Sequence, residues 1–204
     1  MTDTVERLSE LSKKYYEKGW MLATAGNLSF RKGEGFWVTA SGKPKGNLAS
    51  KDFVYVRTKD GEILQAEEGN RPSLEASIHR SIYLAKGEVG ACLHLHTVNS
   101  TIFSLGLDSN TPYALAPIPS IEMIKAFGIW EEKPQLSMVV FYNYSDVLKI
   151  SKAVEDFFKS NPQYPLPFLL IEGHGPTIWG SDLNMANQHL EATIFLFDVI
   201  AAMR

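Results

Sequence analysis

The sequence predicts an α/β protein in which helices cover a central sheet. Segments with the alternating or continuously apolar character of strands take turns with segments of helical periodicity along the whole chain. Turns rich in glycine and proline separate these segments, and no internal repeat or low-complexity linker interrupts them. A chain of 204 residues, 45% of them hydrophobic, can bury one sizeable core. We therefore expect a single domain over residues 1–204.

The first half of the chain predicts a helix followed by two pairs of strands. Asp3 and Glu6 mark the start of the helix, apolar residues then recur at helical spacing, and Gly19 ends it. Four segments with the character of strands follow, at residues 28–31, 36–40, 53–58 and 62–65. The Asp60-Gly61 step between the last two favours a tight hairpin turn, and we expect this hairpin at the periphery of the sheet.

The rest of the chain alternates helices with further strands. Helical patterns predict helices at residues 72–84, from about 99, at 120–128, at 146–159 and from about 182 to 203. Apolar runs predict buried strands at residues 89–97, 138–144 and 167–173. Residues 111–119 contain three prolines and are predicted to form a loop. The order and direction of the strands stay open at this level.

Charge and cysteine content narrow the classes of function. The 20 basic and 23 acidic side chains are intermixed, without the basic stripe typical of proteins that bind nucleic acid or anionic membranes. Cys92 is the single cysteine and lies in an apolar run, which excludes an internal disulfide and favours a reducing compartment. The first residues contain acids and no apolar signal segment, and no apolar stretch is long enough to span a membrane. We therefore expect a cytoplasmic protein with no nucleic acid and no membrane partner.

Two histidines within a predicted strand indicate a metal site. His94 and His96 are one residue apart, and because strand side chains alternate between faces, both imidazoles are expected on one face. Imidazole suits zinc and neighbouring transition ions, and a catalytic ion typically has three protein ligands and one open position. The third ligand that we predict is His174, which lies between two glycines after another predicted strand. His79 and His189 fall within predicted helices and are interpreted as ordinary helix residues.

A purely structural role is the main alternative for these histidines. Buried histidines often satisfy their hydrogen bonds within a core and bind nothing. Two adjacent buried imidazoles that share no ion, however, lose their hydration without compensation. We therefore favour one bound divalent ion, with zinc (Zn2+) expected and other transition ions as alternatives.

Two carboxylates and several small polar residues are candidates for the remaining chemistry. Glu75 lies at a predicted helix start, and Glu122 lies in the segment IEMIK. Each can act as a general acid or base near a metal ion, or can simply stabilise the first turn of its helix through the helix dipole. The segments GNLS and SGK, together with Ser73, offer free N–H groups, hydroxyls and one lysine suited to a phosphate, although surface turns use the same residue types.

The motifs GNLS, TASGKPKG, PSLEASIH, HLHT and EGHG resemble, in order and approximate spacing, those of the class II aldolase/adducin family over nearly the whole chain. This resemblance implies a three-layer α/β/α sandwich with a largely antiparallel central sheet, and a homotetramer with active sites near subunit interfaces. The family's metal ligands correspond to His94, His96 and His174. Its phosphate-binding positions correspond to Asn27, Ser41, Gly42 and Ser73. Leu74 stands where many members have a second serine, which leaves part of the phosphate site open.

Within the family, the segments IEMIKAFG and LLIEGHGPTIWG are most similar to the branch that removes water from 5-methylthioribulose 1-phosphate in methionine salvage. The acid/base residue of that branch corresponds to Glu122, whereas the catalytic carboxylate of the aldolases corresponds to Glu75. The resemblance thus implies a metal-dependent hydro-lyase acting on a phosphorylated ketose, with Glu122 transferring the protons and Glu75 assisting.

Two other functions remain open at this point. A class II aldolase or epimerase acting on a fuculose or ribulose phosphate would share the ion and the phosphate site. An adducin-like module would keep the fold without catalysis, but it would have lost the metal site. All three histidines are present, which argues against that second alternative.

Overall fold

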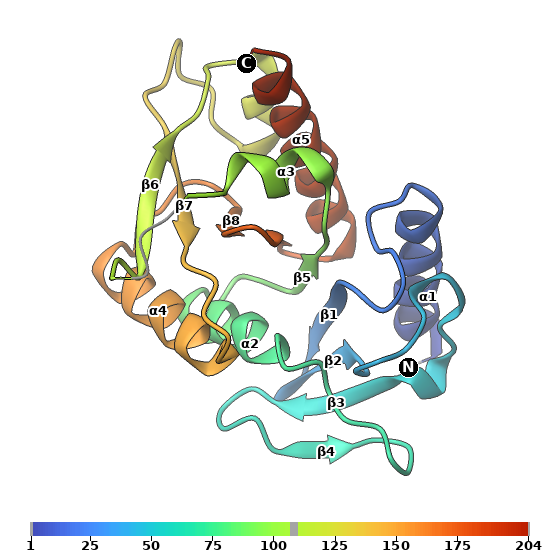
Figure 1. Ribbon diagram of the computed structural model, residues 1–204. Coiled ribbons are helices and arrows are strands. Elements are labelled where there is room, and N and C mark those ends of the chain that lie inside the picture. Colours follow the sequence, from blue (N-terminus) through green and yellow to red (C-terminus); the bar gives the residue numbers. More distant parts are fainter. Residues whose placement is uncertain (1, 107–109, 204) are drawn as a thin grey trace.

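The centre of the protein is one sheet of nine strands. The computed structural model describes residues 2–106 and 110–203, and all strands of these residues join this sheet (Figure 1). The strands are β1 (Asn27–Lys32), β2 (Gly35–Thr39), β3 (Phe53–Arg57), β4 (Ile63–Gln65), β5 (Ala91–His94), β6 (Tyr113–Pro117), β7 (Ser137–Phe141), β8 (Phe168–Ile171) and β9 (Gly175–Gly180). Their order is β4-β3-β2-β1-β5-β9-β8-β7-β6, and only β7 and β8 run parallel. The expected largely antiparallel sheet is confirmed.

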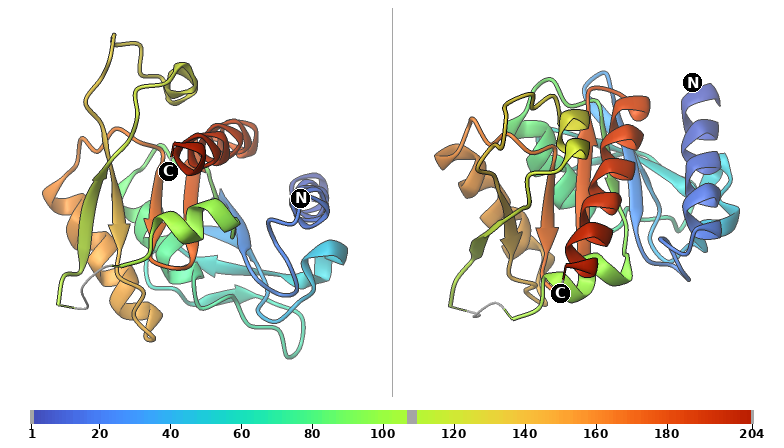
Figure 2. Two further views of the ribbon diagram at one scale, coloured as in Figure 1. Left: turned by 45° about the horizontal axis from the view of Figure 1, so that its top comes forward. Right: turned by 90° about the horizontal axis from the view of Figure 1, so that it is seen from above.

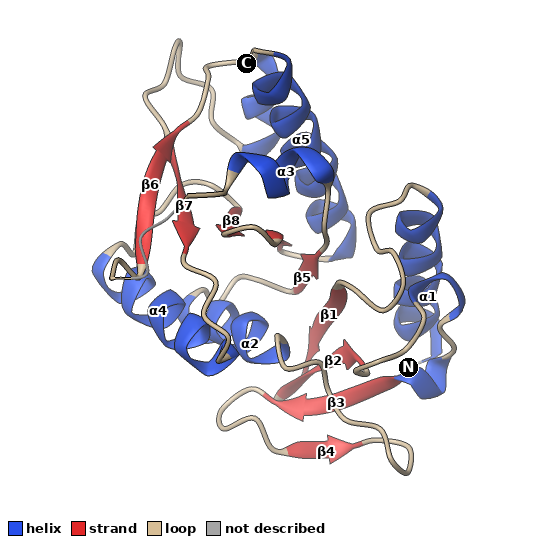
Figure 3. Ribbon diagram, in the orientation of Figure 1, coloured by secondary structure: helices blue, strands red, loops and turns tan. Residues whose placement is uncertain are grey.

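Helices cover both faces of the sheet and complete three layers (Figures 2 and 3). One face carries α1 (Thr2–Glu17), α3 (Val98–Phe103), α5 (Leu183–Ala202) and the 3-10 helix η3 (Glu122–Phe127). The other face carries α2 (Ala76–Ala85) and α4 (Val147–Ser160), while the short η1 (Lys45–Asn47) and η2 (Ser50–Asp52) contact α1. No helix in the described part of the chain has both the length and the apolar character needed to cross a membrane.

Strand alternation divides the apolar residues between two cores. In β5, Leu93 points into the core beneath α1 and α5, whereas Cys92 points into the core beneath α2 and α4. His94 is two residues beyond Cys92 and therefore shares the α2 side of the sheet. The strand pattern thus directs the first candidate metal ligand toward α2 and toward Glu75, which immediately precedes that helix.

Three local predictions differ from the structure. Residues 113–117 form strand β6 rather than a loop; Pro117 is tolerated because β6 is an edge strand that pairs only with β7. Residues 175–180 form β9, which we did not predict because the segment follows directly after the tight turn at Gly173. The strand predicted over 89–97 ends at His94, so His96 lies just beyond it.

Candidate metal centre and active site

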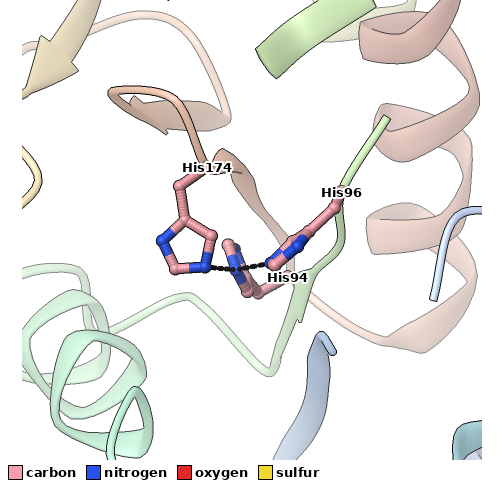
Figure 4. Close-up of side chains that lie close together, drawn as sticks. All are labelled: His94, His96 and His174. Atoms are coloured by element: carbon pink, nitrogen blue, oxygen red, sulfur yellow. Dashed lines mark hydrogen bonds between the residues drawn. The ribbon is translucent and has the colours of Figure 1, made fainter. Parts of the chain in front are cut away.

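The three predicted histidine ligands meet at one point of the sheet. His94 ends β5, His96 follows two residues later, and His174 lies in the turn that joins β8 to β9. Because β9 lies between β5 and β8, that turn lies beside the end of β5. Nε2 of His94 is 3.0 Å from Nε2 of His96 and 3.3 Å from Nε2 of His174 (Figure 4). The rings therefore direct equivalent nitrogens toward a shared centre.

Backbone features hold the turn and the strand end together. Gly173 has a φ of 57°, a left-handed conformation that permits the tight turn before His174. A side chain at Gly175 would collide with the backbone of Leu95, so glycine is needed for this close approach. The N–H of His96 donates to the carbonyl of Trp20 at 2.9 Å, which fixes the segment after β5. The flanking glycines noted in the sequence thus have a definite structural role.

The environment of His94 selects the tautomer that a metal site needs. Its Nδ1 lies 2.9 Å from the carbonyl oxygen of Pro176 and 3.1 Å from Oγ1 of Thr177. A carbonyl only accepts hydrogen bonds, so Nδ1 carries the proton and Nε2 keeps its lone pair. Burial lowers the pKa of His94 to about 4 and that of His96 to about 3. Both rings are therefore neutral at pH 7, the state in which imidazole binds a metal.

The spacing of the three nitrogens fits a tetrahedral ion. Ligand nitrogens ~2.0–2.1 Å from a zinc ion lie ~3.3–3.4 Å apart in tetrahedral geometry. The measured separations of 3.0 Å and 3.3 Å from Nε2 of His94 are close to that value. Three imidazoles whose Nε2 atoms converge can hold a divalent ion and leave a fourth position for a substrate.

Glu75 lies directly beside the histidines. Its Oε1 is 2.9 Å from Nε2 of His174 and 3.7 Å from Nε2 of His94, and Nδ2 of Asn27 donates to Oε2 at 2.5 Å. Burial raises the pKa of the Glu75 carboxyl, but the neighbouring imidazoles of His94, His174 and His96 outweigh that effect and hold the pKa below its ordinary range. The carboxylate is therefore ionised at neutral pH, directly beside the histidine cluster.

The segments predicted to bind phosphate also come together. An isolated bridge pairs Ala40 with Pro72, so that the turn at Ser41 and Gly42 lies beside Ser73. Gly42 has a φ of 70°, and its α-carbon faces open space. Asn27 is fully buried and reaches this region through its hydrogen bond to Glu75. Asn27 therefore contacts the carboxylate beside the histidines, and the turn at Ser41 and Gly42 lies beside Ser73, which is two residues before Glu75 in the chain.

Glu122 lies away from the cluster within one chain. It is the first residue of η3, its side chain is 83% exposed, and Nζ of Lys125 donates to its Oε1 at 2.8 Å. At the other end of η3, Phe127 packs on Phe168, the first residue of β8, whereas His174 follows the opposite end of that strand. The spatial arrangement therefore brings Glu75, but not Glu122, to the histidines of its own chain.

The remaining two histidines lie outside the cluster. His79 is buried in α2 with its Nδ1 2.7 Å from Oγ of Ser29, and His189 lies in α5 with its Nδ1 2.7 Å from the carbonyl oxygen of Trp179. Sequence reasoning did not identify Pro176 and Thr177, which orient His94. Their position two and three residues after His174 was the one available signal.

The chain as a whole matches a known protein family. The model of the class II aldolase and adducin N-terminal domain matches residues 6–200. This chain belongs to the class II aldolase and adducin family. Class II aldolases typically depend on a divalent metal ion, and the cluster of His94, His96 and His174 could hold one.

Relatives within the class II aldolase and adducin family match over nearly their full length. The methylthioribulose-1-phosphate dehydratase of Leptospira biflexa serovar Patoc is 49% identical over 201 residues, which cover 97% of this chain and 96% of that protein. The enzyme of the same name from Microcystis aeruginosa is 40% identical over 203 residues, which cover 99% of this chain and 97% of that enzyme. Among solved structures, YgbL of Klebsiella pneumoniae superposes with a TM-score of 0.80 at 23% identity, covering 100% of this chain and 91% of YgbL. That last likeness confirms the fold predicted from the motifs.

Proposed function

We propose that this protein is a hydro-lyase that removes water from 5-methylthioribulose 1-phosphate and releases 2,3-diketo-5-methylthiopentyl 1-phosphate, a step of methionine salvage. The observation that carries the proposal is similarity over the full length to enzymes of that name, 49% over 97% of the chain for the Leptospira biflexa protein. The histidine cluster, the adjoining carboxylate and the small polar residues suited to a phosphate support it.

The proposed cofactor is one Zn2+ per subunit, held by His94, His96 and His174. Three imidazoles with one open position are typical of catalytic zinc, and the nitrogen spacing suits its tetrahedral geometry. When bound, the ion supplies a Lewis acid that polarises the C2 carbonyl of the substrate and so acidifies the proton on C3. Asn27, Ser41, Gly42 and Ser73 are proposed to hold the phosphate group, which anchors the sugar relative to the histidines.

The remaining steps of the dehydration are proton transfers. A carboxylate removes the C3 proton, and an acid protonates the C4 hydroxyl so that the C4–O bond breaks and water leaves. The resulting enol takes up a proton at C4 and loses the proton of its C3 hydroxyl, so that C3 becomes the second carbonyl carbon of the product. We assign these proton transfers to Glu122, and we assign Glu75 an assisting role because it already contacts two of the histidines.

Because Glu122 is exposed and away from the histidines of its own chain, it can serve this reaction only at the site of a neighbouring subunit. We therefore propose a homotetramer in which one subunit supplies the metal and phosphate residues and another supplies Glu122. The surface around the site suits subunit contacts. Val98 and Ile102 on α3, which begins two residues after His96, are 74% and 54% exposed.

A second function is favoured by one specific contact. Glu75, the residue that corresponds to the catalytic carboxylate of the aldolases, is the carboxylate that the fold brings to the histidines. A class II aldolase or epimerase would use it to deprotonate the C4 hydroxyl and break the C3–C4 bond. That chemistry needs no contribution from Glu122, and so the two functions differ in the carboxylate that they require.

The deciding experiment is incubation of the zinc-loaded protein with 5-methylthioribulose 1-phosphate, followed by NMR and mass spectrometry of the products. Loss of water to the diketo phosphate is the expected result. Dihydroxyacetone phosphate plus methylthioacetaldehyde would identify an aldolase. With metal verifiably bound, absence of turnover would direct attention to other pentulose and hexulose phosphates, and failure to bind any metal would favour an adducin-like module without catalysis.

The remaining expectations concern partners and location. The partner is a phosphorylated ketose, and we expect neither nucleic acid nor a membrane. Cys92 is free and buried, which agrees with the reducing conditions of the cytoplasm, the location that we expect for this enzyme.

A further inference from the structure

Lys45 is a buried lysine with little to neutralise it. The residue is 1% exposed, although lysine is almost never buried without a charged partner. Its Nζ donates to the backbone carbonyl of Lys43 at 3.1 Å, and within residues 2–106 and 110–203 no carboxylate lies within 4.0 Å of it. Two of its three N–H donors therefore lack a protein acceptor in the described part of the chain.

The nearby acidic side chains do not form an ion pair with the Lys45 ammonium. The carboxylate of Asp52 is engaged elsewhere, because its Oδ2 accepts from the N–H of Ala49 at 2.9 Å and its Oδ1 lies 3.5 Å from Nζ of Lys43. Burial lowers the pKa of Lys45, whereas the charges of Glu75 and Asp52 raise it. An ammonium group in this position gains from any further anion that binds nearby.

Two hydrogen bonds fix the backbone of Lys45 and so fix the point from which its side chain extends. The carbonyl of Lys45 accepts from Oγ of Ser12 at 2.7 Å, and its N–H donates to the carbonyl of Ala23 at 3.3 Å. From there the side chain turns back to the loop that contains Ser41 and Gly42, where its Nζ donates to the carbonyl of Lys43. The ammonium thus contacts the residue that follows Gly42 in the loop proposed to hold the phosphate, and the charge of Glu75 raises its pKa.

We propose that Lys45 is a phosphate-binding residue, whose ammonium supplies the buried positive charge for the phosphate group of the substrate. This inference rests on the proposed function, because it assigns the anion to the phosphorylated ketose. Small polar groups such as Ser41 and Ser73 can donate hydrogen bonds, but they carry no charge against a dianion. Lysine binds phosphate as a point charge, and its side chain, held by one carbonyl contact, can reorient toward the anion.

The proposal is tested by titrating inorganic phosphate into the zinc-loaded, full-length protein by calorimetry. Lys45→Met keeps the length of the side chain and removes its charge, and we expect it to weaken phosphate binding about tenfold or more. Lys51→Met is the matched control, because it removes a positive charge from an exposed position in the neighbouring η2 and should leave the affinity unchanged. With 5-methylthioribulose 1-phosphate, the loss should appear in KM, with kcat nearly retained, since the contact exists before and during the reaction.

The outcomes separate this inference from the proposed function. If the wild-type protein binds phosphate through Lys45 but does not dehydrate the substrate, the phosphate site stands and the proposed function is wrong. If the protein dehydrates the substrate but Lys45→Met binds phosphate as tightly as wild type, or if wild type does not bind phosphate, the role of Lys45 is overturned. Should Lys45→Met fail to fold, Lys45→Gln is measured in the same way; if both variants unfold, Lys45 is a structural cation and the proposal is wrong.

Discussion

Oε1 of Glu75 lies 2.9 Å from Nε2 of His174. Glu75 precedes α2, whereas His174 lies in the turn between β8 and β9, so this contact joins two distant parts of the chain. Because Nε2 of His174 is a proposed metal ligand, the carboxylate borders the proposed metal site. Glu75 is therefore expected to affect the histidine cluster whichever carboxylate transfers the protons.

Replacement of one histidine should remove the metal and the activity together. We expect His96→Ala to bind zinc at least tenfold more weakly and its kcat to fall more than about 100-fold, because the two remaining imidazoles no longer enclose the ion. Elemental analysis and turnover of 5-methylthioribulose 1-phosphate measure the two effects. His189→Gln serves as the control, since His189 lies in α5 outside the cluster; equal metal loss in both variants would contradict the assignment.

The two carboxylates should differ in their effect on catalysis. We expect Glu122→Gln to lower kcat about 100-fold or more while folding and metal content stay unchanged, because the residue is exposed and an amide cannot exchange the proton. Glu75→Gln should have the smaller effect on kcat. Glu131→Gln, an exposed change in the loop after η3, is the control. Retention of turnover by Glu122→Gln together with its loss in Glu75→Gln would favour the aldolase-like mechanism instead.

A site shared between subunits should be restored by mixing two inactive proteins. When Glu122→Gln and His96→Ala subunits are unfolded and reassembled together, about a quarter of the sites should combine an intact carboxylate with intact histidines. The measurement is dehydratase activity before and after reassembly, with each variant reassembled alone as the control. Activity that stays at background would indicate that each site is built from a single chain.

The buried His79 should make stability depend on pH. Burial lowers its pKa to about 4 in the folded protein, below the value of about 6.5 expected in the unfolded chain. Between these values the unfolded state binds more protons, so the free energy of unfolding should fall as the pH decreases from about 6.5 to about 4. The contribution is at most about 1.4 kcal/mol per pH unit. Urea unfolding of the metal-free protein should show a shallower pH dependence for His79→Gln than for wild type; parallel curves would contradict this account.

Much of the fold could be predicted because its cues are local. The early helix ending at Gly19, the hairpin at Asp60-Gly61 and the helix over 146–159 each depend on periodicity and turn residues that lie within a few positions of one another. The prediction was wrong at residues 111–119 because proline excludes a residue from the interior of a sheet but not from its edge. Whether a strand lies at an edge depends on which other strands pair with it, and the local pattern contains no such information.

In the candidate site, too, some features follow from local sequence patterns and others depend on which segments pack together. The sequence by itself predicted which histidines come together, because alternation along one strand and a glycine-flanked turn indicated His94, His96 and His174. Only the tertiary structure decided that Glu75 rather than Glu122 lies beside them, and that Lys45 is buried with its Nζ against the carbonyl of Lys43. The physical reason is that the effect of a charged side chain depends on its distance from other groups and on its burial. Both are set by the packing of segments far apart in the chain, which no local pattern specifies.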